Sequence, residues 1–127
     1  MRSPNFWRAL RFAMEGIVYM VRTQRNARIH LVILFLVIVA GILLKVTLLE
    51  WGLIVVVSGL VLSLEAVNSG IEALVDMVQP DHHPLAKAAK DAAAGAVLLA
   101  AIAAVGVGLI VFGPRVWTLI QPLANPR

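Results

Sequence analysis

The sequence predicts an all-helical integral membrane protein, in which one amphipathic helix lies on the membrane surface and three helices cross the bilayer. The 127-residue chain is 61% hydrophobic and 14% charged, whereas soluble domains are about 45–50% apolar and about 25% charged. It also holds three apolar stretches, each close to the ~20 residues that a helix needs to span a bilayer. We expect one membrane domain over residues 1–127. The lack of cysteine excludes disulfides and thiolate metal sites.

The first expected element is a surface helix, which together with a cytoplasmic arm occupies residues 1–28. Its apolar side chains recur at three- and four-residue spacing and its charged side chains lie on other faces, as in helices that lie in the membrane surface. The apolar positions are Phe6, Leu10, Ala13, Met14, Ile17 and Val21. A disordered basic arm is the alternative. No small-residue cleavage site follows, so we expect the mature protein to keep its first residues.

Three membrane helices follow the surface helix. We expect them at residues 29–49, 51–78 and 91–112. The second is uncharged as far as Leu64 and then becomes polar on one face, and its last turns should project out of the hydrocarbon. The third carries no charge after Asp91 and contains a stripe of small residues four apart, which favours close packing against another helix. Gly113 and Pro114 predict its end, so residues 113–127 should form a tail.

The distribution of positive charge predicts the orientation of these helices. Six arginines precede the first span, namely Arg2, Arg8, Arg11, Arg22, Arg25 and Arg28. Lys87 and Lys90 lie in the connection before the third span. Because lysine and arginine are enriched in cytoplasmic segments, the N-terminus and this connection should be cytoplasmic. The tail, with Arg115 and Arg127, should face the other side.

Polar side chains follow one face of the second membrane helix. Glu65, Asn68, Glu72 and Asp76 are spaced three, four and four residues apart, so they project from the same face. Ionisable groups inside a membrane usually face protein or a hydrated cleft and serve a function. The deeper Glu65 suits a general base for a hydroxyl, because a drier carboxylate binds a proton more tightly. Carboxylates nearer the water suit a divalent cation that shares phosphate oxygens. An interhelical hydrogen-bond network without chemistry is the alternative.

The connection after this helix supplies positive charge on the same side. Lys87, Lys90 and Asp91 lie about the start of the third span, where a lysine and free backbone N–H groups can hold phosphate. Metal ligation by His82 and His83 is an alternative, although adjacent histidines in a short loop more often face solvent or contact a nucleotide. The G-x-x-x-x-G-K-[ST] loop and the protein-kinase motifs do not occur in the chain. Phosphate transfer would therefore need a different scaffold.

Two segments together resemble the prokaryotic diacylglycerol kinase and undecaprenol kinase family. They are EAVNSGIEALVD at 65–76 and HPLAKAAKDAAAGAVLL at 83–99, and RTQRNARIHL at 22–31 also fits the family. The resemblance covers about residues 5–113. It implies a homotrimer of three-span subunits with a surface helix in the bacterial cell membrane. It also implies ATP as phosphoryl donor, magnesium as cofactor and a membrane lipid alcohol as acceptor, with no nucleic-acid partner.

The resemblance implies roles for individual residues by position. Glu65 matches the proposed catalytic base of the family, and Asn68 matches the asparagine beside the transferring phosphate. Glu72 matches a metal ligand, and Lys90 and Asp91 match residues that contact the nucleotide. The expected ATP-binding set is Gln24, Glu72, Asp81, His82, His83, Lys90 and Asp91.

Two positions distinguish this chain within the family that it resembles. Where the family commonly has a second metal-binding carboxylate, this chain has Gln24, whose amide oxygen can coordinate magnesium but brings no charge. Either the metal is held more weakly, or Asp76, Asp91 and the phosphates complete its shell. Where enterobacterial diacylglycerol kinases tend to have serine, this chain has Ala94. Ala94 and Glu65 are the expected acceptor contacts, and undecaprenol is favoured over diacylglycerol as the acceptor.

Two other classes of function are compatible with a polar face inside a membrane. A small proton-coupled transporter would use the carboxylates as a relay, but its relay should reach both faces of the membrane. Here the acidic residues run from mid-membrane to the cytoplasmic side only. A non-catalytic membrane adaptor would leave the polar face without a role. The lipid kinase is therefore the preferred interpretation.

Overall fold

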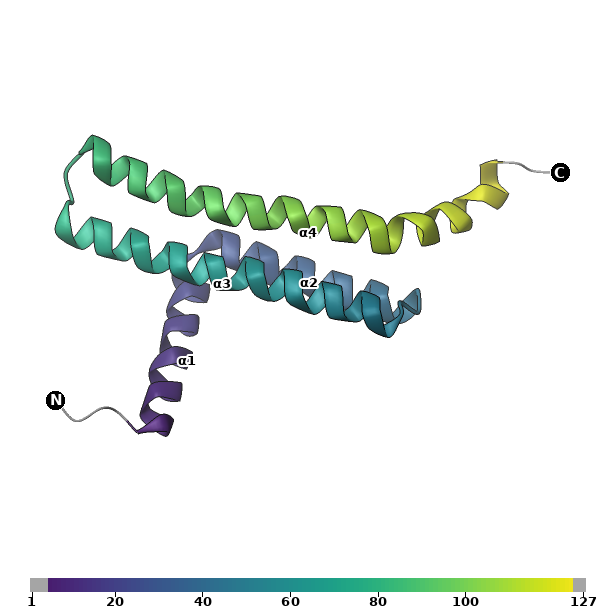
Figure 1. Ribbon diagram of the computed structural model, residues 1–127, viewed down its shortest axis with the longest axis horizontal. Helices are drawn as coiled ribbons and strands as arrows, with labels where there is room; N and C mark the ends of the chain where they lie inside the picture. The colour runs from purple at the N-terminus through teal and green to yellow at the C-terminus, as the bar shows by residue number, and fades with distance from the viewer. Residues whose placement is uncertain (1–4, 125–127) are drawn as a thin grey trace.

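The computed structural model describes residues 5–124, and these residues form four helices (Figure 1). The helices are α1 (Phe6–Thr23), α2 (Arg25–Leu43), α3 (Leu48–Val78) and α4 (Pro84–Ala124). The axes of α2, α3 and α4 are nearly parallel, with α3 antiparallel to the other two, and α1 projects from them at a steep angle (Figure 1). Each of α2, α3 and α4 is long and apolar enough to cross a membrane. The predicted all-helical class with three potential spans is confirmed, whereas Arg2 and Arg127 of the orientation argument lie outside the described residues.

Helix α1 meets α2 at a sharp corner that consists of one residue. Gln24 has an extended backbone (φ −102°, ψ 116°) and separates the two helices. The last carbonyl groups of a helix lack donors within that helix. Here Arg28 donates hydrogen bonds to the carbonyl oxygens of Val21 and Arg22, at 3.3 and 3.1 Å. These bonds stabilise the end of α1, so the chain can turn at once into α2.

Residues 6–23 are helical, so the alternative of a disordered arm is wrong for this segment. Asn5 begins α1, because its side-chain oxygen accepts a hydrogen bond from the backbone N–H of Arg8 at 3.1 Å. Large apolar side chains of α1 are exposed, among them Phe6, Trp7 and Leu10. The placement of α1 in the membrane surface stays a prediction.

The first membrane helix ends earlier than residue 49, so the predicted span 29–49 is wrong at that end. Helix α2 stops at Leu43, and Lys45 has a positive φ of 52°, which a right-handed helix does not tolerate. Thr47 then begins α3 with a capping box. Its hydroxyl accepts from the N–H of Glu50, and the Glu50 carboxylate accepts from the N–H of Thr47 at 2.7 Å. The T-x-x-E spacing of Thr47 and Glu50 in the sequence indicates this helix start.

Helix α4 is longer than the predicted 91–112 at both ends. It begins at Pro84, because proline suits the first turn of a helix, where its missing N–H has no partner to lose. It also continues through Gly113 and Pro114 to Ala124, so the predicted tail is wrong for residues 113–124. A proline inside a helix removes one hydrogen bond and bends the helix, but need not end it. The last part of α4 is bent in this way (Figure 1).

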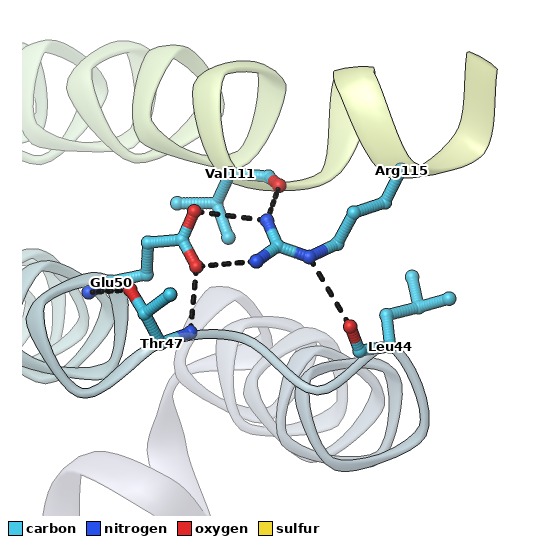
Figure 2. Close-up of polar contacts among 5 residues, drawn as sticks. All are labelled: Leu44, Thr47, Glu50, Val111 and Arg115. Carbon is cyan, nitrogen blue, oxygen red and sulfur yellow. Dashed lines mark hydrogen bonds and ion pairs between the residues drawn. The ribbon is translucent and has the colours of Figure 1, made fainter. Parts of the chain in front are cut away.

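Arg115 joins α4 to the turn between α2 and α3, one residue after Pro114 (Figure 2). Its guanidinium donates to the two carboxylate oxygens of Glu50, at 2.9 and 2.6 Å. It also donates to the carbonyl oxygens of Leu44, at 3.2 Å, and Val111, at 2.6 Å. A two-pronged pair of this kind gives geometric specificity as well as energy. The pair therefore holds the three long helices together at this end of the molecule.

Close packing at the same end joins α2 to α3. A Cβ atom at Gly41 would lie 2.6 Å from the ring of Trp51, closer than real side chains approach. Beside this contact, a small buried cluster consists of Val46, Ile54 and Val111. Most other apolar side chains of the three long helices are exposed, as expected for surfaces that face lipid.

We predict that Gly41→Ala destabilises the protein, although alanine favours helices over glycine. The added methyl group must displace the Trp51 ring, and such overpacking costs about 1–3 kcal/mol. The midpoint of thermal unfolding in detergent should fall by several degrees. Gly106→Ala is the matched control, because no atom lies within 4 Å of its added Cβ, and it should leave the midpoint unchanged or raised. Equal midpoints for the two variants would contradict the packing argument.

Candidate functional site

The polar face of α3 passes from buried to exposed along the helix. Glu65 and Asn68 are 1% and 5% exposed, Glu72 is half-buried, and the Asp76 side chain is 65% exposed. The four residues lie on one face, as their spacing predicts. The face thus leads from the interior of the helix bundle to the end at which α3 joins α4.

Glu65 is buried without a hydrogen-bond partner among residues 5–124. Neither of its carboxylate oxygens accepts a hydrogen bond there, and the same is true of Oδ1 of Asn68. The neighbouring Ser69 hydroxyl donates to the backbone carbonyl of Glu65, at 2.8 Å, and not to its carboxylate. Since buried polar atoms nearly always have partners, these atoms require an explanation, such as a catalytic role or a bound water, ion or ligand.

A cavity of about 280 Å³ adjoins Glu65 and Asn68. Its other lining residues come from α2 and α4, and they are Asn26, Ile29, His30, Ala94, Val97, Leu98 and Ala101. The cavity therefore brings together the expected base and Ala94, the expected acceptor contact. A buried carboxylate that faces a cavity can receive a proton from a bound molecule, provided that the molecule's hydroxyl reaches it.

Amide groups hold the Glu72 carboxylate from two sides. Nε2 of Gln24 donates to one of its oxygens at 2.7 Å, and Nδ2 of Asn68 donates to the other at 3.4 Å. Gln24 and Glu72 are 48 residues apart in the sequence, so the corner between α1 and α2 is what brings them together. The amide nitrogen of Gln24, and not its oxygen, therefore faces the carboxylate.

The remaining candidate residues line a second cavity, of about 360 Å³, between the end of α3 and the start of α4. Its polar lining includes Asp76, Asp81, His82, His83, Lys87, Lys90 and Asp91. Nζ of Lys90 donates to Asp76 at 2.8 Å, and Lys87 forms an ion pair with Asp91. These pairs are exposed, and exposed ion pairs contribute little free energy. An anionic ligand can therefore recruit the lysines at little cost.

The donor atoms fit a magnesium ion that is shared with phosphate, but not a metal site made of protein alone. Within the described part of the chain, no three histidine, aspartate or glutamate side chains gather closely enough to hold a metal ion. The Glu72 carboxylate offers hard oxygen ligands, and the adjacent Gln24 would offer its amide oxygen if its amide group turned, because its N–H now faces Glu72. Magnesium usually takes one or two carboxylates and completes its shell with phosphate and water.

Two residues of the cavity beside Glu65 were missed by the sequence analysis, namely Asn26 and His30 of α2. They are four residues apart, and polar residues on one face at the start of an apolar span are a usable signal. The rotation of α2 relative to α3 decides whether they meet Glu65, and the sequence does not reveal that rotation. His30 also lines an adjoining apolar cavity of about 260 Å³, which extends between the three long helices as far as Phe112.

Comparisons with known proteins match most of this chain. The model of the family described as prokaryotic diacylglycerol kinase matches residues 11–112. An undecaprenol kinase of Bacillus subtilis is 40% identical over 111 residues, which cover 87% of this chain and 90% of that protein. A diacylglycerol kinase of Synechocystis is 44% identical over 119 residues (93% and 68%), and one of Helicobacter pylori is 35% identical over 99 residues (77% of each). The family match includes every candidate site residue.

Proposed function

Because this chain belongs to the prokaryotic diacylglycerol kinase family, we propose that it phosphorylates undecaprenol with ATP as the donor. The chain is a membrane lipid kinase, so ATP and a membrane lipid are its substrates. A polyprenol acceptor is supported by the Bacillus subtilis relative, an undecaprenol kinase whose length is 90% covered. Diacylglycerol is the alternative acceptor, supported by the Synechocystis relative at 44% identity.

The observation that carries the proposal is the buried Glu65 carboxylate beside a cavity with both polar and apolar neighbours. A lipid alcohol needs a polar pocket for its hydroxyl and an apolar surface for its chain. The polar cavity at Glu65 and the adjoining apolar cavity share His30 and Ala101, so the two are adjacent. A hydroxyl at Glu65 can thus belong to a molecule whose chain continues between the helices.

In the proposed reaction, Glu65 takes the proton of the lipid hydroxyl. The hydroxyl oxygen bonds to the γ-phosphorus of ATP as the bond from that phosphorus to the bridging oxygen breaks, and ADP leaves. Asn68 lies one turn from Glu65 and donates to the transferring phosphoryl group through its amide N–H. Glu72 and Gln24 are the residues that would hold a magnesium ion, which would supply positive charge to offset that of the phosphates. Lys90, Asp91 and the segment 81–83 contact the nucleotide.

We further propose that the site lies on the cytoplasmic side of the bacterial cell membrane, where ATP is available. Lys87 and Lys90 lie at the same end of α3 and α4 as the exposed end of the polar face, and positive residues favour that side. Helix α1 ends beside this polar face, where Gln24 contacts Glu72, and its exposed apolar residues suit the membrane surface. The homotrimer is proposed from family membership alone.

A panel of acceptors tests the proposed function. Purified protein in detergent receives labelled ATP and magnesium with either undecaprenol or diacylglycerol. We expect label in both lipids, with kcat/KM for undecaprenol higher by about tenfold or more, since the pocket must discriminate chains and head groups. A higher value for diacylglycerol would reverse the assigned acceptor. No label in any lipid would refute the proposal, and proton flux in vesicles would then favour a transporter.

Glu65→Gln should abolish most of the activity while nucleotide binding persists. The amide keeps the shape of the side chain but cannot accept the hydroxyl proton, and loss of a general base typically lowers the rate by about 10²–10⁴. Steady-state kinetics and nucleotide binding are measured on the same preparation. Glu15→Gln is the control, because Glu15 is an exposed residue of α1 that pairs with Arg11. Near-normal turnover of Glu65→Gln would remove this residue from the mechanism.

Gln24→Glu should lower the magnesium concentration required for half-maximal rate. The new carboxylate would replace an amide that lies 2.7 Å from Glu72. Two carboxylates at that distance repel each other unless a cation lies between them, so the variant should bind magnesium more tightly. Magnesium titrations of the rate compare the wild type, Gln24→Glu and Gln121→Glu, a control at the other end of the molecule. If the curves of the wild type and Gln24→Glu coincide, residue 24 is not a magnesium ligand, and Asp76 or Asp91 must complete the coordination shell of the ion.

A further inference from the structure

The last part of α4 extends well beyond the length needed to cross a membrane. The helix has 41 residues and is therefore about 60 Å long, about twice the thickness of the hydrocarbon core. Its uncharged stretch between Asp91 and Arg115 accounts for about 35 Å of that length. Residues 115–124 therefore lie beyond the core. They also lie beyond residue 112, where the family match ends, so the family's activity does not explain them.

Residues 115–124 form an amphipathic helical segment. At 100° per residue, the apolar side chains cover about half of the circumference, and the polar ones lie opposite. The apolar positions are Val116, Trp117, Leu119, Ile120 and Leu123, and each is between 45% and 81% exposed. The polar positions are Arg115, Thr118 and Gln121. A contiguous exposed apolar face with a polar rim indicates a surface for protein or membrane contact.

The Glu50–Arg115 pair shows where this segment leaves the membrane core. Charged groups and the exposed backbone of the α2–α3 turn belong in the headgroup region, not among acyl chains. Arg115 contacts both Glu50 and the carbonyl oxygen of Leu44 in that turn (Figure 2). The segment therefore starts at headgroup depth. Pro114 lies immediately before it, and α4 bends in this region (Figure 1).

We propose that residues 115–124 are an interfacial anchor, which lies along the membrane surface beside the α2–α3 turn with its apolar face among the lipids. A straight continuation would carry Trp117, Leu119 and Leu123 into water. Lying in the surface instead places these side chains at the upper acyl chains and leaves Thr118 and Gln121 in water. Tryptophan is also enriched at this depth. The segment continues directly from a membrane-crossing helix, so lipid is the nearest surface that can cover it. The proposal does not depend on which lipid the kinase phosphorylates.

Tryptophan fluorescence tests the anchor in the full chain. The chain has three tryptophans, so Trp7→Phe with Trp51→Phe leaves Trp117 as the single probe. The protein is reconstituted into phosphatidylcholine vesicles whose acyl chains carry bromine either near the headgroup or near the chain end. We expect bromine near the headgroup to quench Trp117 about twofold more than deep bromine does, because interfacial helices lie only about 5–10 Å deep. Acrylamide in the water should quench it weakly.

A second variant moves the probe to the polar face. It combines Trp7→Phe and Trp51→Phe with Trp117→Phe and Thr118→Trp, and the relocated tryptophan should be quenched strongly by acrylamide and weakly by bromine. Circular dichroism confirms that both variants keep the helix content of the wild type. Equal acrylamide quenching of the two probes would mean that the segment projects into water. A Trp117 shielded from both acrylamide and bromine would mean that a second copy covers the face. Either result overturns the proposal.

Discussion

The fold is organised around one unfavourable group, the carboxylate of Glu65 in the middle of an apolar helix. A charge at the centre of a membrane costs roughly 3 kcal/mol or more, so this face of α3 cannot be directed at lipid. Helix α2 contributes Asn26 and His30 beside it, and α4 contributes Ala94. The three long helices thereby enclose a polar cavity within an otherwise apolar molecule. The burial of Glu65, the exposure of Asp76 and the position of the cavity all follow from this arrangement.

The two ends of the helix bundle differ in the kind of contacts that hold the helices together. At the end where α3 joins α4, exposed lysines and aspartates form ion pairs that a ligand can rearrange. At the other end, Arg115, Glu50 and the capped start of α3 form a compact and partly buried set of hydrogen bonds, and Trp51 packs on Gly41. The second end is therefore the more closely packed one. Exposed ion pairs at the end that we propose to bind the nucleotide, and close packing at the far end, suit a site that must admit and release its substrates.

The polar face of α3 could be predicted from the sequence, because three- and four-residue spacing alone determines which side chains share a helix face. The end of α2 could also have been predicted, since Thr47 and Glu50 form a recognisable capping signal. The continuation of α4 through Pro114 could not, because a proline may bend or end a helix and only the contacts of Arg115 with another turn favour bending. The position of His30 in the cavity beside Glu65 could not be predicted for a similar reason. Its distance from Glu65 depends on how α2 is rotated against α3.

Gln24 meets two separate requirements at the corner between α1 and α2. Its backbone must adopt an extended conformation between two helices, and its side chain must span the gap to Glu72. Glutamine and glutamate have the same number of side-chain carbons, so either can make this reach from the same backbone. Asparagine and aspartate are one methylene shorter and would stop short of Glu72. Side-chain length, as much as charge, therefore restricts which amino acids can stand at the corner.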